Sequence, residues 1–178
     1  GLLLKATEDE RIRRYLGSEY EMYRAALDVV VPLLAEDPRP RYLMGLGSPM
    51  DLLDAVDAGI DMFDSVLPAR VARNATLWVP DGRLNMRNAR FLDDPRPVQE
   101  DCECRLCRSF SRAYLAHLMR ADEMLGYRLA TCHNLTFTLD FMTKIRTAIR
   151  AARSPNTSRI AFSSATSPTG VLVPWALI

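Results

Sequence analysis

A cluster of cysteines beside one histidine is the feature that most constrains this chain. Cys102, Cys104 and Cys107 fall within six residues, and the remaining cysteine, Cys132, directly precedes His133. Structural zinc sites take four thiolate or imidazole ligands in a tetrahedron, and close cysteine spacing is typical of them. Disulfides are less expected, because the N-terminal residues show no secretory signal. The sequence therefore predicts a structural zinc ion, one per chain, bound by the clustered thiolates.

The fourth zinc ligand stays open from spacing alone, because Cys132 and His133 are adjacent. His117, the other histidine, lies in a helical pattern and is interpreted as a surface or half-buried residue. A shell of four protein ligands leaves no position for a substrate, so the site is expected to stabilise the fold. Its formation would be coupled to folding of the small unit around it.

The first part of the chain alternates between helical and strand patterns with short connections. Ser48 as the N-cap, Pro49 at the first helical position and Gly59 as the stop delimit the second helix. This order is typical of a parallel α/β sheet or barrel. The patterns predict helix, strand, helix and strand over residues 20–36, 41–45, 48–59 and 60–66.

Asp64 is the candidate catalytic residue of this part. Period-two alternation would put Asp64 on the same face of its strand as Ile60 and Met62. Asp64 also lies near the C-terminal end of the strand, where α/β barrels place catalytic groups. A single aspartate at a strand end is more often an exposed or capping residue, so the surrounding motif has to decide its role.

The second part of the chain has a different pattern. Asp81-Gly82 between two short apolar runs indicates a β-hairpin. Two helical patterns follow the cysteines, the first lined by Leu115, Leu118, Met119 and Leu125 and the second by Leu135, Leu139, Met142, Ile145 and Ile149. We therefore expect an α/β part over residues 1–74, a zinc-binding part with terminal helices over 75–150, and a flexible tail over 151–178.

The composition is that of an ordinary soluble globular protein, with 48% hydrophobic and 25% charged residues. The net charge of +1 indicates no general affinity for nucleic acid. Among 23 basic residues the lysines are Lys5 and Lys144, and the rest are arginines. That bias suits either phosphate recognition or a genome rich in arginine codons. No stretch approaches the roughly 18 apolar residues of a membrane span, so we expect a cytoplasmic protein with no membrane partner.

Several ordered motifs resemble the tRNA-guanine transglycosylases, the queuine tRNA-ribosyltransferase family. The similarity extends over residues 29–150, and ordered motifs together with the cysteine spacing are far more specific than any one motif. The matching segments are Arg41-Tyr42-Leu43-Met44-Gly45-Leu46-Gly47, Asp61-Met62-Phe63-Asp64-Ser65-Val66-Leu67-Pro68, Arg73-Asn74, Arg87-Asn88-Ala89-Arg90, Ser111-Arg112-Ala113-Tyr114-Leu115 and His133-Asn134-Leu135.

The resemblance implies the C-terminal part of a (β/α)8 barrel with an inserted zinc-binding subdomain. These enzymes exchange guanine at the anticodon wobble position of tRNA for a 7-deazaguanine, preQ1 or queuine, through a covalent Asp-ribosyl intermediate. The implied partners are the tRNA anticodon loop, the free base and a second copy in a homodimer. The resemblance assigns Asp64 as nucleophile, His133 as fourth zinc ligand, Tyr42, Met44 and Gly45 to substrate binding, and Arg70 and Arg73 to tRNA binding.

The chain also departs from the family pattern. The first half of the barrel, with a second catalytic aspartate, is absent, so this chain alone is not expected to be a complete enzyme. Ala75 stands where the family has a glycine, which removes easy access to positive φ and is expected to shift the loop with the arginines. The alternative function is a non-catalytic tRNA-binding or dimer-partner module, which keeps the zinc ligands and loses the nucleophile. The aspartate at 64 favours the catalytic function.

Overall fold

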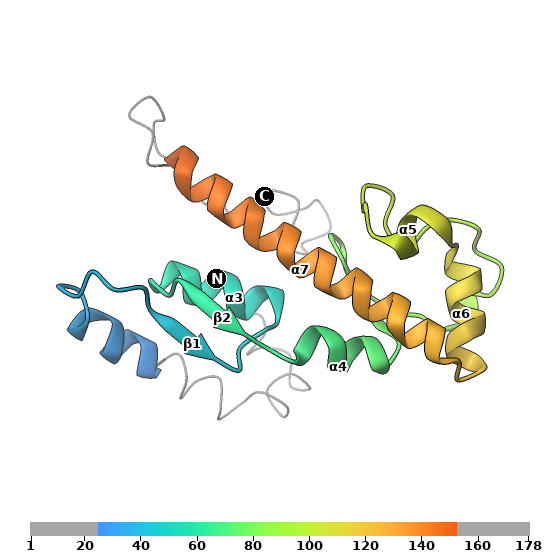
Figure 1. Ribbon diagram of the computed structural model, residues 1–178, viewed down its shortest axis with the longest axis horizontal. Helices are drawn as coiled ribbons and strands as arrows, with labels where there is room; N and C mark the ends of the chain where they lie inside the picture. The colour runs from blue at the N-terminus through green and yellow to red at the C-terminus, as the bar shows by residue number, and fades with distance from the viewer. Residues whose placement is uncertain (1–24, 153–178) are drawn as a thin grey trace, which may run out of the picture.

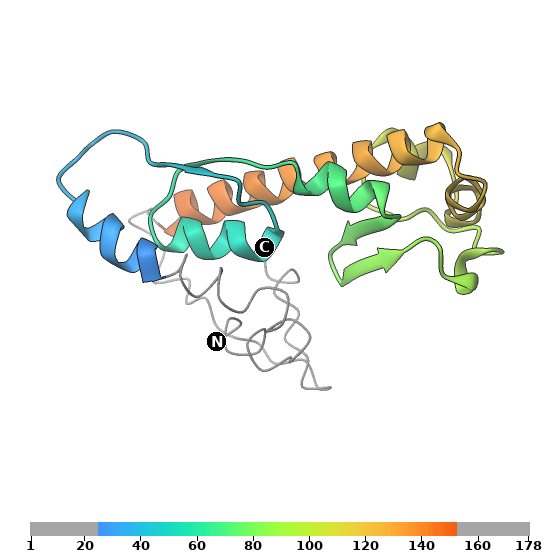
Figure 2. The same cartoon turned by 90° about the horizontal axis from the view of Figure 1, so that it is seen from below.

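One long helix joins two small bodies of mixed helix and strand in the computed structural model, which describes residues 25–152 (Figure 1). This helix, α7 (Met124–Ala152), has 29 residues and is therefore about 43 Å long. Its N-terminal half packs against a β-hairpin and short helices, and its C-terminal half packs against a β–α–β unit. Figure 2 shows these two bodies toward opposite ends of α7.

The first body has the predicted order of helix, strand, helix and strand. A helix over residues 25–33 comes first, and residues 20–24 of the predicted helix lie outside the described part. Strands β1 (Tyr42–Met44) and β2 (Met62–Asp64) pair in parallel. Helix α3 (Pro49–Asp57) connects them. The α/β class is confirmed for the described residues.

Local sequence signals explain the limits of α3. The Ser48 hydroxyl accepts a hydrogen bond of 3.2 Å from the Asp51 backbone N–H, and Pro49 occupies the first turn. Past the helix end, Gly59 adopts a φ of 99°, a conformation that favours glycine. The predicted N-cap and stop of this helix are therefore confirmed.

The prediction that Ile60 and Asp64 lie on the same face of a strand is wrong. Strand β2 starts only at Met62, and Ile60 is buried beside α3 while Met62 and Asp64 are exposed. The backbone N–H groups of Asp61 and Met62 both donate to the Arg41 carbonyl, at 2.9 and 3.0 Å. Two consecutive donors on one acceptor interrupt the strand alternation, so Ile60 points into the core.

The second body begins immediately after β2. Strands β3 (Thr76–Val79) and β4 (Gly82–Asn85) form an antiparallel hairpin in which Val79 pairs with Gly82, as the Asp81-Gly82 signal predicts. Its core is shared by the hairpin, the short helices and the first half of α7. The elements are α4 (Leu67–Arg73), β3 (Thr76–Val79), β4 (Gly82–Asn85), the 3-10 helix η1 (Ala89–Phe91), α5 (Arg105–Ser109) and α6 (Arg112–Arg120).

The first helical pattern after the cysteines divides between two helices. Leu115, Leu118 and Met119 are buried on α6, as predicted. Leu125 belongs to α7 instead and is 43% exposed, so its place in the first pattern is wrong. The reason is a turn at Asp122, where a φ of 59° ends α6 and redirects the chain.

The buried face of α7 agrees only in part with the predicted one. Ile145 is buried, and Met142 and Ile149 pack partly buried against the same core, as predicted. Leu135 and Leu139 are instead 45% and 66% exposed. The inward face is set by Phe137 and Phe141, which follow the buried His133 at intervals of one helical turn. Although α7 is long, no helix within the described residues is apolar enough over a sufficient length to cross a membrane.

Candidate functional site

Four potential metal ligands converge in the second body. The sulfur atoms of Cys102, Cys104 and Cys107 lie 3.6, 3.6 and 3.3 Å from Nδ1 of His133. All four donor atoms lie within 4.8 Å of one another. Zn–S bonds of about 2.3 Å and Zn–N bonds of about 2.0–2.1 Å put tetrahedral S and N ligands about 3.6 Å apart. The group could therefore hold a metal ion, and its dimensions fit zinc.

The hydrogen bond of the His133 ring fixes which nitrogen faces the sulfurs. Nε2 lies 2.8 Å from the backbone carbonyl oxygen of Trp78. Because a carbonyl only accepts, Nε2 keeps its proton, and Nδ1 is the nitrogen at which a metal would replace a proton. A carbonyl partner of this kind orients histidine ligands in metal sites generally.

The three thiols cannot ionise independently at such short range. Hydrogen bonds from Cys102 and Cys107 lower the pKa of the Cys104 thiol, while hydrogen bonds to Cys102 and Cys104 raise the pKa of the Cys107 thiol. Burial alone would lower the pKa of His133, but hydrogen bonds to Cys102 and Cys104 outweigh it and raise this pKa to about 9. A divalent cation would let all three thiols ionise together, so the chemistry of the donors also fits zinc.

His133, not Cys132, is the side chain that the structure brings to the three thiols. His133 is fully buried, whereas Cys132 is exposed on another face of α7. Helix α5 contributes to the arrangement because Cys104 is its N-cap, with the sulfur accepting a bond of 3.4 Å from the Cys107 N–H. The group thus joins α5 and its preceding loop to α7.

Asp64 lies at the C-terminal end of β2 with its side chain exposed. Its Oδ1 accepts a hydrogen bond of 2.6 Å from the Tyr42 hydroxyl and one of 3.4 Å from the Gly45 N–H. The hydrogen bond to Asp64 raises the pKa of Tyr42, with burial and the carboxylate charge acting in the same direction. One carboxylate oxygen is therefore held by two donors.

The substrate-binding candidates gather around Asp64. Tyr42 and Met44 are 51% and 71% exposed on the strand face that bears Asp64, and the strands pair Met44 with Asp64. Gly45 adopts a φ of 80°, and its backbone N–H also donates to the Asp64 carbonyl at 3.1 Å. The structure therefore brings Tyr42, Met44, Gly45 and Asp64 together.

Arg70 and Arg73 lie on α4, the helix that follows Asp64, and both are exposed. Within residues 25–152 neither guanidinium has a hydrogen bond or an ion pair, so both are free to bind a ligand. Ala75, which stands where the family has a glycine, adopts a positive φ of 59° while fully buried, so the substitution has not prevented this backbone conformation. This conformation costs an L-residue about 1–2 kcal/mol.

Sequence reasoning missed two residues near this site. A Cβ atom at Gly47 would overlap the Ser65 side chain, so only glycine lets the β1–α3 loop approach the residue after Asp64. Asn134 is fully buried and hydrogen-bonded to two segments distant in sequence. Both lie inside the matching motifs, but neither residue type signals such a role by itself.

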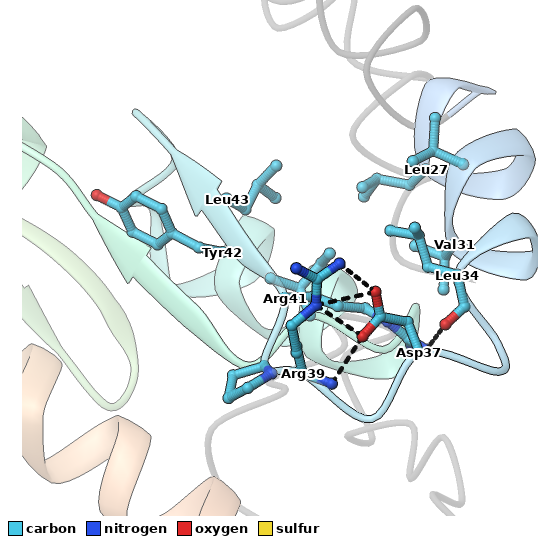
Figure 3. Close-up of a pocket in the computed structure, with 11 residues that line it drawn as sticks. Leu27, Val31, Leu34, Asp37, Arg39, Arg41, Tyr42 and Leu43 are labelled. Carbon is cyan, nitrogen blue, oxygen red and sulfur yellow. Dashed lines mark hydrogen bonds and ion pairs between the residues drawn. The ribbon is translucent and has the colours of Figure 1, made fainter.

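An open pocket of 380 Å³ lies between the helix over residues 25–33 and β1 (Figure 3). Its described lining includes Tyr42 but not Asp64. In Figure 3 the Tyr42 hydroxyl points away from the ion pair of Arg39 and Asp37, whose closest atoms are 2.6 Å apart. The pocket therefore shares Tyr42 with the group around Asp64 but does not include the carboxylate.

Comparison with known proteins identifies the relatives of this chain. The family model described as queuine tRNA-ribosyltransferase matches residues 14–165. The chain belongs to the queuine tRNA-ribosyltransferase family. It is 54% identical over 136 residues to the queuine tRNA-ribosyltransferase of Symbiobacterium thermophilum, and 49% identical over 138 residues to that of Bacillus subtilis.

The queuine tRNA-ribosyltransferases are much longer than the matched region. The alignments cover 76% and 78% of this chain but only 34% and 36% of the proteins from S. thermophilum and B. subtilis. A relative from Streptococcus pyogenes gives a similar result, with 49% identity and 35% of its length covered. The chain thus spans about a third of the length of these family members.

Proposed function

We propose that this chain is the part of a tRNA-guanine transglycosylase that contains the nucleophile and a structural zinc site. The observation that carries the proposal is the geometry at Asp64: an exposed carboxylate at a strand end, with one oxygen held by Tyr42 and Gly45. Membership of the queuine tRNA-ribosyltransferase family supports the reaction class.

The proposed architecture is the C-terminal part of a (β/α)8 barrel. Parallel strands joined by a helix support it, as do a covered face toward α3 and an exposed face that would line the barrel interior. In this proposal residues 1–74 belong to the barrel, residues 75–150 form the zinc-binding subdomain with the terminal helices, and residues 151–178 are a tail.

The proposed reaction consists of two displacements at one ribose carbon. Oδ2 of Asp64, which the hydrogen bonds to Oδ1 leave available, attacks C1′ of the wobble nucleoside while the bond from C1′ to the guanine nitrogen breaks. Guanine leaves with the electron pair and takes a proton from an acid outside the described residues. The 7-deazaguanine nitrogen, preQ1 or queuine, then attacks C1′, loses its proton and displaces the carboxylate. The tRNA stays attached during the exchange.

The other residues bind rather than react. Met44, exposed beside Asp64, would provide an apolar surface for the base that leaves its stack. Arg70 and Arg73 would bind phosphates of the anticodon loop, because free guanidinium groups match phosphate oxygens. The proposal includes a homodimer and a cytoplasmic location, as expected for an enzyme of tRNA.

Zinc would have a purely structural role. Cys102, Cys104, Cys107 and His133 would fill its coordination shell and leave no open position. A zinc ion bound there would neutralise the charge of the thiolates and cross-link α5 to α7. The reacting atoms at Asp64 lie in the other body of the molecule.

The test is a covalent adduct on a denaturing gel. The chain is mixed with a substrate tRNA, with and without a polypeptide that supplies the remaining two thirds of the family's length. We expect an adduct that Asp64→Asn abolishes and that Asp57→Asn, an exposed aspartate at the end of α3, preserves. If no adduct forms with the supplement, while the chain still binds tRNA and one zinc ion, the non-catalytic binding module replaces this proposal.

A further inference from the structure

Asn134 is a fully buried polar residue whose side chain connects three points of the second body. Its Oδ1 accepts a hydrogen bond of 3.0 Å from the Trp78 N–H. Its Nδ2 donates to the carbonyl oxygens of Pro68, at 3.1 Å, and Thr76, at 3.0 Å. The amide nitrogen donates both of its hydrogens and the amide oxygen accepts one bond, so the side chain fixes the relative positions of these groups.

The same helix turn supplies the metal ligand. His133 precedes Asn134 on α7, and its Nε2 donates to the Trp78 carbonyl at 2.8 Å. The two neighbouring side chains therefore bind both backbone groups of Trp78, on the outer edge of the β3–β4 hairpin. An edge of this kind would otherwise present unpaired donors and acceptors.

Pro68 joins this network to the candidate nucleophile. It lies in the first turn of α4, only four residues after Asp64, and Arg70 follows on the same helix. Helix α4 has just seven residues, and its N-cap Val66 offers no side-chain hydrogen bond. So short a helix depends on outside contacts for its position, and Asn134 provides one at its start.

We propose that Asn134 is a positioning residue that couples occupation of the metal site to the placement of the segment from Asp64 to Arg73. The ligand His133 fixes the rotation of α7 about its axis and its position along that axis. The adjacent Asn134 then fixes the position of Pro68 through its hydrogen bond. Loss of the metal would remove the link between His133 and the three thiolates, let α7 shift, and weaken the hold on α4. The importance of this for catalysis rests on the proposed function, but the coupling itself does not.

Hydrogen exchange of the full chain, loaded with zinc, measures the coupling without any assay of activity. We follow the amides of residues 69–73 on α4, and those of α5 as a report on the metal site. In wild-type protein, zinc removal by a chelator should speed exchange in both, while the amides of α3 change little. In Asn134→Ala with zinc bound, exchange in α4 should rise at least about tenfold and α5 should stay protected.

The matched control is Thr138→Val, one turn further along α7, whose hydroxyl donates only within the helix, to the Asn134 carbonyl at 2.8 Å. It should leave exchange in α4 unchanged. If Asn134→Ala fails to bind zinc, Asn134→Asp is used, because it keeps the acceptor for Trp78 and replaces the donor to Pro68 and Thr76 with an oxygen that repels both carbonyls.

Two results would overturn the proposal. The first is unchanged exchange in α4 when the chelator has released α5. The second is unchanged exchange in α4 in zinc-bound Asn134→Ala, or in zinc-bound Asn134→Asp where that variant is used. A missing tRNA adduct with a positive exchange result would instead reject the proposed function and leave the coupling intact, because the two measurements are independent.

Discussion

Asp64 is held by hydrogen bonds to one of its two carboxylate oxygens. The Tyr42 hydroxyl supplies the short one, at 2.6 Å, and the Gly45 N–H supplies the longer one, at 3.4 Å. Hydrogen bonds to a charged group are stronger than neutral ones. The structure thus shows Tyr42 orienting the Asp64 carboxylate, and the substrate-binding role that the sequence suggested stays a prediction.

Tyr42→Phe should slow adduct formation at least about tenfold at saturating tRNA, since a bond to a charged acceptor contributes about 1.5–3 kcal/mol. The tRNA concentration for half-maximal rate should stay the same, because the phenol would act on the carboxylate and not on tRNA binding. Single-turnover kinetics with the supplemented chain measures both. Tyr114→Phe, which alters a partly exposed tyrosine on α6, is the control. Equal slowing in both variants would argue against a specific role for Tyr42.

Zinc binding at His133 should release a proton at neutral pH. Because the pKa of His133 without metal is raised to about 9, its Nδ1 is protonated at pH 7 and zinc must displace that proton. The contribution of His133 to apparent zinc affinity should therefore increase from pH 7 to pH 9 and level off above it. Competition with a coloured chelator across this range measures the affinity. Affinity that is flat with pH would show that neither His133 nor the thiols lose protons on binding.

The order and limits of the elements were predictable wherever local chemistry sets them. The Ser48 cap, the turn at Gly59 and the hairpin at Gly82 depend on residues within a few positions of one another. The exposure of Leu135 and Leu139 was not predictable, because tertiary contacts of His133 and Asn134 choose which face of α7 points inward. Helical spacing alone fits both faces equally well.

The candidate sites also divide into features set by local sequence and features set by tertiary contacts. Three metal ligands were evident from the spacing of the cysteines. The spacing could not choose between His133 and Cys132, because the rotation of α7 about its axis decides which of the two faces the thiols. Asp64 and its neighbours were identified through motif resemblance. The hydrogen bond from Tyr42 depends on the parallel register of β1 and β2, which pairs residues 20 positions apart. No local pattern encodes that register.

Adjacent residues on α7 should differ completely in their effect on metal content. His133→Ala should abolish stoichiometric zinc binding and expose the hairpin edge at Trp78, because both the ligand and the hydrogen bond are lost. Cys132→Ser should keep one zinc ion per chain, since that thiol is exposed and outside the group. Metal analysis after dialysis, together with circular dichroism, compares the two. Zinc loss in Cys132→Ser would reassign the fourth ligand.

At the scale of the whole molecule, α7 contributes buried residues both to the large core of the second body and to a core of the β–α–β body. Phe141 and Ile145 pack with Leu52 of α3 in one core, while Leu129 and Ala130 belong to the other. The β–α–β body contributes few buried side chains of its own, in clusters much smaller than that of the second body. Its stability therefore depends on the far half of α7.

Phe141→Ala should destabilise the β–α–β body by about 3 kcal/mol, within the range for phenylalanine truncation in cores, and should leave zinc binding intact. Leu139→Ala, on the same helix but 66% exposed, should change the free energy of unfolding by less than about 0.5 kcal/mol. Urea unfolding with zinc content measured in parallel tests both. Loss of zinc in Phe141→Ala would mean that the two bodies unfold as one.

The single helix also restricts how the length of this chain can vary. One residue inserted between Asn134 and Phe137 would rotate everything beyond it by about 100° and advance it by about 1.5 Å. The metal ligand would keep its place, but Phe141 and Ile145 would turn away from α3. The number of residues between His133 and Ile145 is therefore constrained, because it sets the angle between the metal ligand and the residues that pack on α3. Insertions and deletions among related chains should instead collect in the irregular stretches at 92–101 and 121–123.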